Sequence, residues 1–270
     1  MQGIADYTFV QSLGEGNHGT FHLAVTPARL PISAEFVAVK VLSGRASDEV
    51  FRRATKELRA FAAVRSPYLV SLYDAGQDQG AFYYAMEYCP LGSLASPTQA
   101  LTRPTVLRAV EHAARAAHAL HDAGVVHRDI KPANILLHES GAKLSDLGLA
   151  QLLEPGPTMS AMGPVGSLEF MDRALLQGAH PSAASDIWSL GATLHRALSG
   201  TGLYGQLPDD DALLALRKVL STEPTMDPSL GGAAADLVRL CLSTDTINRP
   251  DAAHVAEAIQ DVTKQESAVG

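Results

Sequence analysis

The feature that most constrains the fold is a change in the pattern of apolar residues near residue 90. Before Pro90, short runs rich in β-branched and aromatic residues alternate with turns, and the densest of them is Phe36–Leu42, which indicates strands. After Gly92 the apolar residues recur at helical spacing, as in the long alanine-rich stretch at residues 105–123. We therefore expect an α+β protein with a mainly antiparallel sheet in its first part and helices in its second.

The expected elements follow from these patterns and from the residues that flank them. A helix is expected to begin at residues 47–49, where acid lies in the first turn, and to end at Ser66-Pro67. Strands are expected at residues 7–10, 20–25, 36–42, 69–75 and 81–87, with a turn at residues 76–80 between the last two. The later helices are expected at residues 105–123, 182–199, 212–220, 233–242 and 252–262.

Composition limits the class of protein. With 21 Lys and Arg against 29 Asp and Glu, the formal net charge is −8, which disfavours a nucleic-acid binder. Two cysteines cannot make a disulfide framework, and this fits a reducing compartment. No apolar run reaches the roughly 18 residues of a spanning helix, and residues 1–7 lack a signal pattern. We expect a globular, cytoplasmic protein that has no membrane segment and binds no nucleic acid.

The segment HRDIKPAN at residues 127–134 groups an acid, a cation and an amide. Asp129 can orient a hydroxyl, Lys131 can neutralise a phosphate, and Asn134 can offer an oxygen to Mg²⁺. Asp146, which follows an expected strand, is a second hard oxygen ligand of the kind that Mg²⁺ prefers. An Asx turn is the alternative explanation for Asp146. Together these residues predict phosphoryl transfer.

A glycine-rich turn and a buried lysine precede this segment. Gly14, Gly16 and Gly19 lie between two expected strands, whereas a dinucleotide-binding fingerprint opens a helix. The backbone N–H groups of such a turn can close over phosphates, although an ordinary glycine hairpin is an alternative. Lys40 lies within an apolar strand, where it is costly to bury unless Glu57 of the following helix pairs with it. A lysine that extends to solvent from an edge strand is the alternative.

Taken in order, these motifs resemble those of the Hanks-type protein kinases, and they are most similar to the compact bacterial serine/threonine kinases. The similarity continues through SDIWSLG at residues 185–191 and NRP at residues 248–250, and covers about residues 7–262. It implies a two-lobed fold and an enzyme that transfers the γ-phosphoryl group of ATP to Ser and Thr hydroxyls of proteins, itself included, with Mg²⁺. The implied domains are an N-lobe at residues 7–88, a C-lobe at residues 89–263 and a tail at residues 264–270.

The resemblance also implies residue roles. Asp129 would orient the substrate hydroxyl, Lys131 would contact the γ-phosphate, and Asn134 and Asp146 would hold Mg²⁺. Lys40, oriented by Glu57, would hold the α- and β-phosphates, and Asp186 would brace the backbone of the Asp129 loop. Met86 would be the gatekeeper, and the Glu87 carbonyl and the Cys89 amide would bond to the adenine edge. The residues implied to contact ATP are Leu13, Gly14, Gly16, Gly19, Phe21, Ala38, Lys40, Met86, Glu87, Cys89 and Leu136.

Arg128, beside Asp129, is expected to receive a phosphate from the activation segment, which runs from Asp146 to about residue 174. Thr158 and Ser160 are the expected phosphorylation sites, because pairing with Arg128 would order the segment. Ser167 is expected to be structural, since it matches the family's Gly-Thr position near the substrate.

The sequence departs from the family pattern at three places, of which His18, at the tip of the glycine turn where many kinases carry an aromatic residue, is expected to be a solvated tip residue. Phe21 replaces a valine above the adenine, where a ring either narrows the pocket or turns away, so Phe21→Val is expected to tighten ATP binding. The Ala-Pro-Glu element appears as residues 172–174 without its glutamate. Its usual partner, Arg249, must therefore find another acid or lie in wetter surroundings. The acids considered for it are Asp172, Asp245 and Asp251, and a looser activation segment is expected.

Two other functions are weighed against an active kinase. A pseudokinase that binds nucleotide as a scaffold is slightly favoured by Phe21 and by the altered element at residues 172–174. A small-molecule phosphotransferase of the antibiotic-kinase type would lack the combination of Lys131, Asp186 and Arg249. The expected partners of an active kinase are protein substrates and, transiently, a second copy of the chain.

Overall fold

The computed structural model describes residues 3–16, 19–42, 48–146, 165–208 and 211–269, and these form two compact units. The first unit contains residues 3–63 and Val70–Cys89, and the second contains Val64–Leu69 and the described residues after Cys89. The change in sequence pattern near residue 90 therefore coincides with the boundary between the two units at Cys89.

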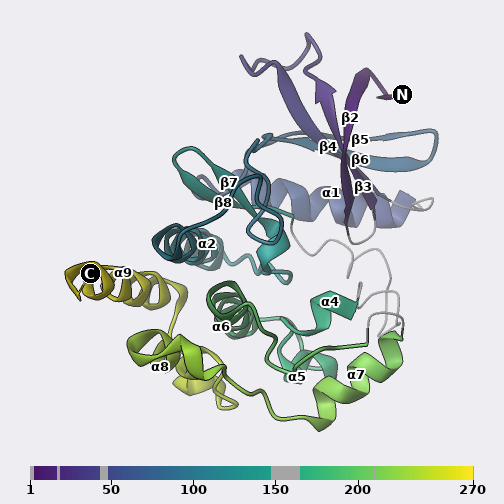
Figure 1. Cartoon of the computed structure of the whole chain (residues 1–270). Coiled ribbons are helices and arrows are strands. Elements are labelled where there is room, and N and C mark those ends of the chain that lie inside the picture. The colour runs from purple at the N-terminus through teal and green to yellow at the C-terminus, as the bar shows by residue number, and fades with distance from the viewer. Residues whose placement is uncertain (1–2, 17–18, 43–47, 147–164, 209–210, 270) are drawn as a thin grey trace. The chain divides into compact units, whose positions relative to one another are not determined.

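The first unit is a six-stranded antiparallel sheet with one helix, α1 (Asp48–Ala63) (Figure 1). The strand order is β1-β2-β3-β4-β6-β5. The strands are β1 (Gly3–Ile4), β2 (Tyr7–Gly16), β3 (Gly19–Val25), β4 (Phe36–Leu42), β5 (Leu72–Asp78) and β6 (Ala81–Met86). The expected sheet-and-helix arrangement of this part is confirmed.

Alternation along the strands gives this sheet two different faces. Val39 belongs to a buried apolar cluster on one face, so its neighbour Lys40 points to the opposite face. Tyr84 of β6 lies directly across from Lys40, and Phe82, two residues before it, shares that face. The Phe82 ring contacts the Phe51 ring of α1 edge-on, with centroids 5.3 Å apart. Helix α1 therefore covers the face that carries Lys40.

The turn between β5 and β6 is tighter than the sequence suggested. Gln79 and Gly80 make it, with φ of 49° and 85°. Gly76, expected in the turn, stays within β5 opposite Tyr83. A Cβ on Gly76 would lie 2.6 Å from the Tyr83 hydroxyl, so glycine is needed there for close packing and not for a turn.

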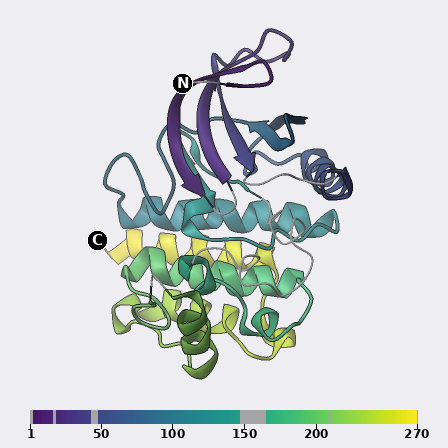
Figure 2. The same cartoon turned by 90° about the vertical axis from the view of Figure 1, so that its right-hand side faces the viewer.

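The second unit is built on helices and a two-stranded hairpin. Figure 2 shows α2 (Arg103–Asp122), α6 (Ala183–Ser199) and α9 (Ala252–Val269) running alongside one another. The hairpin is β7 (Ile135–His138) and β8 (Gly141–Leu144). The other helices are α4 (Val165–Leu168), α5 (Arg173–Leu176), α7 (Ala212–Ser221) and α8 (Gly232–Cys241), with 3₁₀ turns at Pro132–Asn134, Pro228–Leu230 and Thr246–Asn248.

Leu69 marks a difference from the expected strand at residues 69–75. It forms a bridge with Leu144 of β8, and the Leu144 amide bonds to the Tyr68 carbonyl at 2.8 Å. This pairing attaches residues 64–69 to the second unit, and β5 begins only at Leu72.

Helix α6 is the centre of the second unit. Every residue from 185 to 195 is buried, as expected of a helix enclosed on all sides. Ser182 and Ser185 form a capping box at its start, and Gly200 ends it in the left-handed conformation with φ of 73°. This rigid, well-capped helix carries Asp186 in its first turn.

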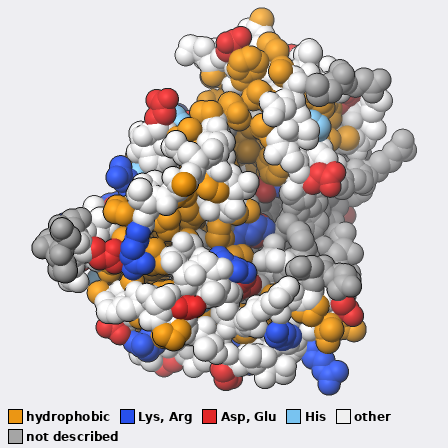
Figure 3. Space-filling view, viewed as in Figure 1, with side chains coloured by type: hydrophobic (Ala, Val, Ile, Leu, Met, Phe, Trp, Pro, Cys, Tyr) orange, Lys and Arg blue, Asp and Glu red, His pale blue; other side chains and the backbone are white. Residues whose placement is uncertain are grey.

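The expected α+β class is confirmed by these two units. On the face shown in Figure 3, side chains of both charge signs are interspersed over the helical unit. Within the described ranges, no helix combines the length and the apolar character needed to cross a membrane.

Candidate active site

Asp129 is the centre of a polar cluster in the loop between α2 and β7. Its Oδ2 accepts a hydrogen bond from Asn134 Nδ2 at 2.9 Å and lies 2.9 Å from Lys131 Nζ. Asn134 Nδ2 also donates to the Asp129 carbonyl at 2.7 Å. Lys131 and Asn134 are buried, whereas the Asp129 side chain keeps 17% of its surface exposed. The structure thus brings together the acid, the cation and the amide of the HRDIKPAN segment and leaves the acid accessible.

Asp186 holds the backbone of this loop from helix α6. Its Oδ2 accepts from the His127 amide at 2.8 Å, and its Oδ1 accepts from the Arg128 amide at 2.9 Å. The Asp186 side chain is 1% exposed, and charge-assisted bonds of this kind are strong when water is excluded. Arg128 has φ of 74°, which costs energy for a residue with a side chain. The expected bracing by Asp186 is confirmed, and it maintains this strained residue beside Asp129.

His127 links the loop to the end of strand β8. Its Nε2 lies 3.0 Å from the Ser145 carbonyl, and the Asp129 amide donates to its Nδ1 at 3.4 Å. These two partners require a neutral ring that carries its proton on Nε2. Complete burial lowers the pKa of His127, which favours the same neutral form.

Asp146 is placed beside Asn134 through Ser145. The Ser145 amide and hydroxyl both donate to the Asn134 carbonyl, at 2.9 and 3.1 Å. Asp146 is buried and has φ of 59°, a conformation that is uncommon outside glycine and concentrates at functional sites. Because the Asn134 amide nitrogen faces Asp129, its side-chain oxygen is the atom left for a cation. Asn134 and Asp146 thus each offer a hard oxygen of the kind that Mg²⁺ prefers.

Lys131 connects the loop to the segment after residue 165. Its Nζ donates to the Ser167 hydroxyl at 3.0 Å, and Ser167 on α4 is buried. One lysine therefore contacts both the Asp129 carboxylate and the segment expected near the substrate. This buried contact agrees with a structural role for Ser167.

Arg249 finds its acid in Asp172. The two side chains are 2% and 6% exposed, and Arg249 Nη1 lies 2.5 Å from Asp172 Oδ2. Arg249 also donates to the carbonyls of Ala184 and Ser243, at 2.7 and 2.8 Å, and its guanidinium lies 5.2 Å from the centre of the Trp188 ring. Of the two alternatives for Arg249, another acid or wetter surroundings, the first is confirmed, because the buried Asp172 pairs with it.

The three acids considered for Arg249 have different tasks. Asp172 Oδ1 accepts a hydrogen bond from the Ala174 amide at 3.0 Å. Asp172 therefore caps α5 with one carboxylate oxygen while the other pairs with Arg249. Asp245 and Asp251 accept from the backbone amides of Ile247 and His254. The acid of this element thus comes two residues earlier than in the family pattern. Asp172 anchors the end of the activation segment to Arg249, and because residues 147–164 lie outside the described residues, a looser activation segment stays a prediction.

Lys40 is buried in the first unit, at 4% exposure. Phe21 of β3 and Tyr84 of β6 are its direct neighbours across the sheet. Its Nζ lies 4.8 Å from the centre of the Phe21 ring and 6.0 Å from that of Tyr84. The Phe21 ring therefore does not turn away from Lys40 but contacts its ammonium group. Glu57 is partly buried on α1, the helix that covers this face, and its pairing with Lys40 stays a prediction.

The glycines of the β2–β3 turn have local structural reasons. Gly14 has φ of 125°, which favours glycine. Gly19 lies against β4, where a Cβ would be 2.2 Å from the Val41 carbonyl oxygen. Gly16 pairs with Gly19 in the ladder. Close strand packing therefore explains part of the motif, and a phosphate contact stays a prediction for these glycines.

The other residues expected to contact ATP divide between the two units. Ala38 and Met86 are buried and face each other across β4 and β6, and Leu13 of β2 is 37% exposed. The Glu87 amide donates to the Ser71 carbonyl at 2.8 Å. Cys89 is buried at the end of the first unit, and Leu136 is partly buried on β7 of the second. The expected phosphorylation sites Thr158 and Ser160, and His18, lie outside the described residues.

Three contributors to these clusters were not recognised from the sequence. Tyr84 faces Lys40, Ser145 joins Asn134 to Asp146, and His121 Nε2 lies 2.8 Å from Asp186 Oδ2. A signal existed only for Tyr84, because an antiparallel register between the expected strands would have set it beside Lys40.

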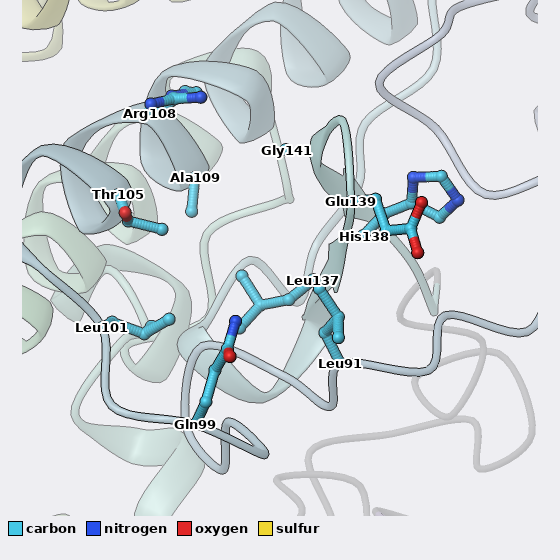
Figure 4. Close-up of a pocket in the computed structure, with 10 residues that line it drawn as sticks. All are labelled: Leu91, Gln99, Leu101, Thr105, Arg108, Ala109, Leu137, His138, Glu139 and Gly141. Atoms are coloured by element: carbon cyan, nitrogen blue, oxygen red, sulfur yellow. The ribbon is translucent and has the colours of Figure 1, made fainter.

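A cavity of about 200 Å³ lies in the second unit. Figure 4 shows the side chains of Leu101, Ala109 and Leu137 around it, with His138 and Glu139 beyond the hairpin strand. It is lined by Leu91, Gln99, Leu101, Thr105, Arg108, Ala109, Leu137, His138, Glu139 and Gly141. None of the expected catalytic or metal-binding residues lines it, so it is not the candidate active site.

Comparison with known proteins agrees with the resemblance. The sequence profile of the protein kinase domain matches residues 7–259. A probable serine/threonine-protein kinase of Clostridium perfringens is 27% identical over 265 residues, which is 96% of this chain and 38% of that protein. A protein named as a serine/threonine-protein kinase in Corynebacterium efficiens is 30% identical over 95% of this chain and 51% of its own length. PknA of Mycobacterium tuberculosis is 31% identical over 76% of this chain and 50% of its length.

The chain thus spans about half or less of the length of these relatives.

Proposed function

The chain belongs to the protein kinase family, and from that premise we propose that it is an active serine/threonine protein kinase. It transfers the γ-phosphoryl group of ATP to Ser and Thr hydroxyls of proteins and of its own chain. The observation that carries the proposal is the Asp129 cluster, in which Lys131 Nζ and Asn134 Nδ2 both lie 2.9 Å from one carboxylate oxygen of Asp129. The names of the bacterial relatives support the serine/threonine class.

Asp129 is the residue that accepts the hydrogen bond of the attacking hydroxyl. Its carboxylate is partly exposed, and the bonds from Lys131 and Asn134 fix its orientation. Lys131 places a cation next to that carboxylate, where it offsets the negative charge of the transferring phosphoryl group. Phosphoryl transfer depends mainly on position and charge neutralisation, so a rigid, braced loop supplies what the reaction needs.

Asn134 and Asp146 are proposed to hold Mg²⁺ in the second unit. The donation from Ser145 to the Asn134 carbonyl keeps these two residues adjacent, and both side chains offer hard oxygens. When bound, Mg²⁺ neutralises charge on the β- and γ-phosphates. The buried position of Asn134 and Asp146 limits competition from bulk water for the same oxygens.

ATP itself is proposed to lie against the Lys40 face of the first unit. Lys40, with Glu57, holds the α- and β-phosphates, and Ala38 and Met86 give the apolar surface for the base. Leu13 and Leu136 complete the apolar contacts with the base, and Phe21 lines the ATP site beside Lys40. The Glu87 carbonyl and the Cys89 amide bond to the adenine edge. Gly14, Gly16 and Gly19 form the phosphate-covering turn.

Regulation by phosphorylation is part of the proposal. Arg128 receives the phosphate of Thr158 or Ser160 by a charge-assisted pair. A transient pair of chains, in which each phosphorylates the other, is the proposed route, and the cytoplasm is the proposed location.

No observation among the described residues favours a pseudokinase. The altered element at residues 172–174 favoured it slightly, but Asp172 supplies the missing acid to Arg249. Transfer of labelled phosphate from ATP to the chain and to a generic basic protein tests the two functions, with Asp129→Asn as the control. Incorporation well above the control supports the kinase. Bound ATP with no transfer above the control supports the pseudokinase.

A further inference from the structure

We infer that Phe21 and Tyr84 are positioning residues for Lys40, whose ammonium they hold in place to meet the nucleotide phosphates. The inference rests on the proposed function, because it acts through the phosphate contact of Lys40. It gives the aromatic residue at position 21 a task different from that of the valine expected there.

The three residues form one row across three neighbouring strands. Strands β3, β4 and β6 lie in one sheet (Figure 1). Phe21 of β3 pairs with Lys40 of β4, and Lys40 pairs with Tyr84 of β6. Direct cross-strand partners project from the same face of a sheet, so both rings flank the lysine stem. The Lys40 ammonium lies 4.8 Å from the Phe21 ring centre and 6.0 Å from that of Tyr84. Both distances fall within the range of a cation–π contact.

The burial of Lys40 strengthens the cation–π contacts of its ammonium group. Lys40 is 4% exposed, so its ammonium has lost most of its water, and attraction to a ring face is stronger under those conditions. An ammonium carries three N–H donors, and a ring face attracts the cation without supplying an oxygen acceptor. The rings can therefore hold the lysine from the sides while its N–H groups are directed to anionic oxygens.

A lysine side chain also has several rotatable bonds, and fixing them costs conformational entropy. Rings that already fix the ammonium before ATP arrives remove part of that cost from the binding step. Removing a ring should therefore weaken ATP binding. Phe21 should have the larger effect because its ring centre is 1.2 Å nearer, at 4.8 Å against 6.0 Å for Tyr84.

This consequence opposes the expectation drawn from sequence alone. If the Phe21 ring only narrows the adenine pocket, a smaller side chain should tighten binding of ATP and of adenosine alike. If the ring acts through Lys40, a smaller side chain should weaken ATP binding and leave adenosine binding unchanged, because adenosine has no phosphate for Lys40 to contact.

The test measures the dissociation constants of ATP and adenosine by titration calorimetry on the whole chain. The variants that remove a ring are Phe21→Leu, Phe21→Met, which keeps a long apolar side chain, and Tyr84→Leu. Phe21→Tyr and Tyr84→Phe retain a ring. Phe9→Leu is the matched control, because Phe9 lies on the same sheet but stacks on His22, with ring centres 4.0 Å apart. Thermal unfolding of each variant establishes that it is folded.

The expected loss of ATP affinity is about three- to tenfold for Phe21→Leu and Phe21→Met, and smaller for Tyr84→Leu. The ring-retaining variants, the Phe9→Leu control and all adenosine titrations should match the original chain. In a Lys40→Met background, Phe21→Leu should cause no further loss, since the group on which the ring acts is gone.

Three results would overturn the inference while the proposed function stands. They are tighter ATP binding by Phe21→Leu, an equal change for ATP and adenosine, and a loss that persists in the Lys40→Met background. Unaltered ATP binding by every ring-removing variant would overturn it as well. If the original chain itself does not bind ATP, both the proposed function and this inference are wrong.

Discussion

Replacing Asp172 with asparagine should strongly destabilise the second unit, because it removes the only charge that faces Arg249 in the contacts described for it. Asparagine caps helices as well as aspartate does, so the bond to the Ala174 amide can persist. The variant therefore isolates the lost charge. Arg249 would stay buried at 2% side-chain exposure without a counterion.

The expected cost follows from the burial of the pair. Removing one partner of a buried ion pair costs about 3–5 kcal/mol. The remaining bonds from Arg249 to the Ala184 and Ser243 carbonyls offset part of this loss, so we expect about 3 kcal/mol. That is a large fraction of the roughly 5–15 kcal/mol that stabilises a typical domain.

Urea unfolding followed by circular dichroism measures the effect as a lower midpoint at unchanged slope. Glu223→Gln is the matched control, because it removes an ion pair to Arg173 in which the glutamate is 82% exposed. Such a pair is worth less than about 1 kcal/mol. The reasoning would be refuted if Asp172→Asn cost no more than Glu223→Gln.

Three further outcomes are expected. Burial lowers the pKa of His127, so its contribution to stability is complete above its unfolded pKa of about 6.5 and is lost as the pH falls toward the folded value. The urea midpoint should therefore drop between pH 8 and pH 5.5, and less steeply in His127→Gln; equal slopes would refute this. Gly19→Ala should destabilise the first unit, because its Cβ would lie 2.2 Å from the Val41 carbonyl oxygen, and an unfolding midpoint equal to that of the original chain would contradict the packing. Replacing both Thr158 and Ser160 with alanine should lower turnover in a phosphate-transfer assay, and full turnover with no phosphopeptide from the segment would exclude these sites.

The elements with a strong local signal were predictable from sequence. The β-branched run at Phe36–Leu42 is strand β4 at the expected residues. Ser182 begins the expected helix as a cap, one residue before α6 (Ala183–Ser199). The turn predicted at residues 76–80 was too long, because Gly76 lies within β5. A glycine needed for close packing against the Tyr83 ring cannot be distinguished in sequence from a glycine needed for a turn.

The candidate site was predictable to the extent that its residues are close in sequence. Asp129, Lys131 and Asn134 lie within six positions of one another, and a short loop brings them together. The partner of Arg249 could not be chosen from sequence, because Asp172 is 77 residues away and only the tertiary fold selects it. The contact of Phe21 with Lys40 likewise depends on strand register, which a list of motifs does not contain.

The central claim is that the Asp129 cluster performs phosphoryl transfer. The most direct measurement is the rate of labelled phosphate transfer from ATP by the purified chain, beside an Asp129→Asn variant in which ATP binding is measured separately. We predict that Asp129→Asn binds ATP with unchanged affinity and loses transfer by about 10²-fold or more. Equal transfer by the two proteins, or bound ATP with no transfer by either, would contradict the account.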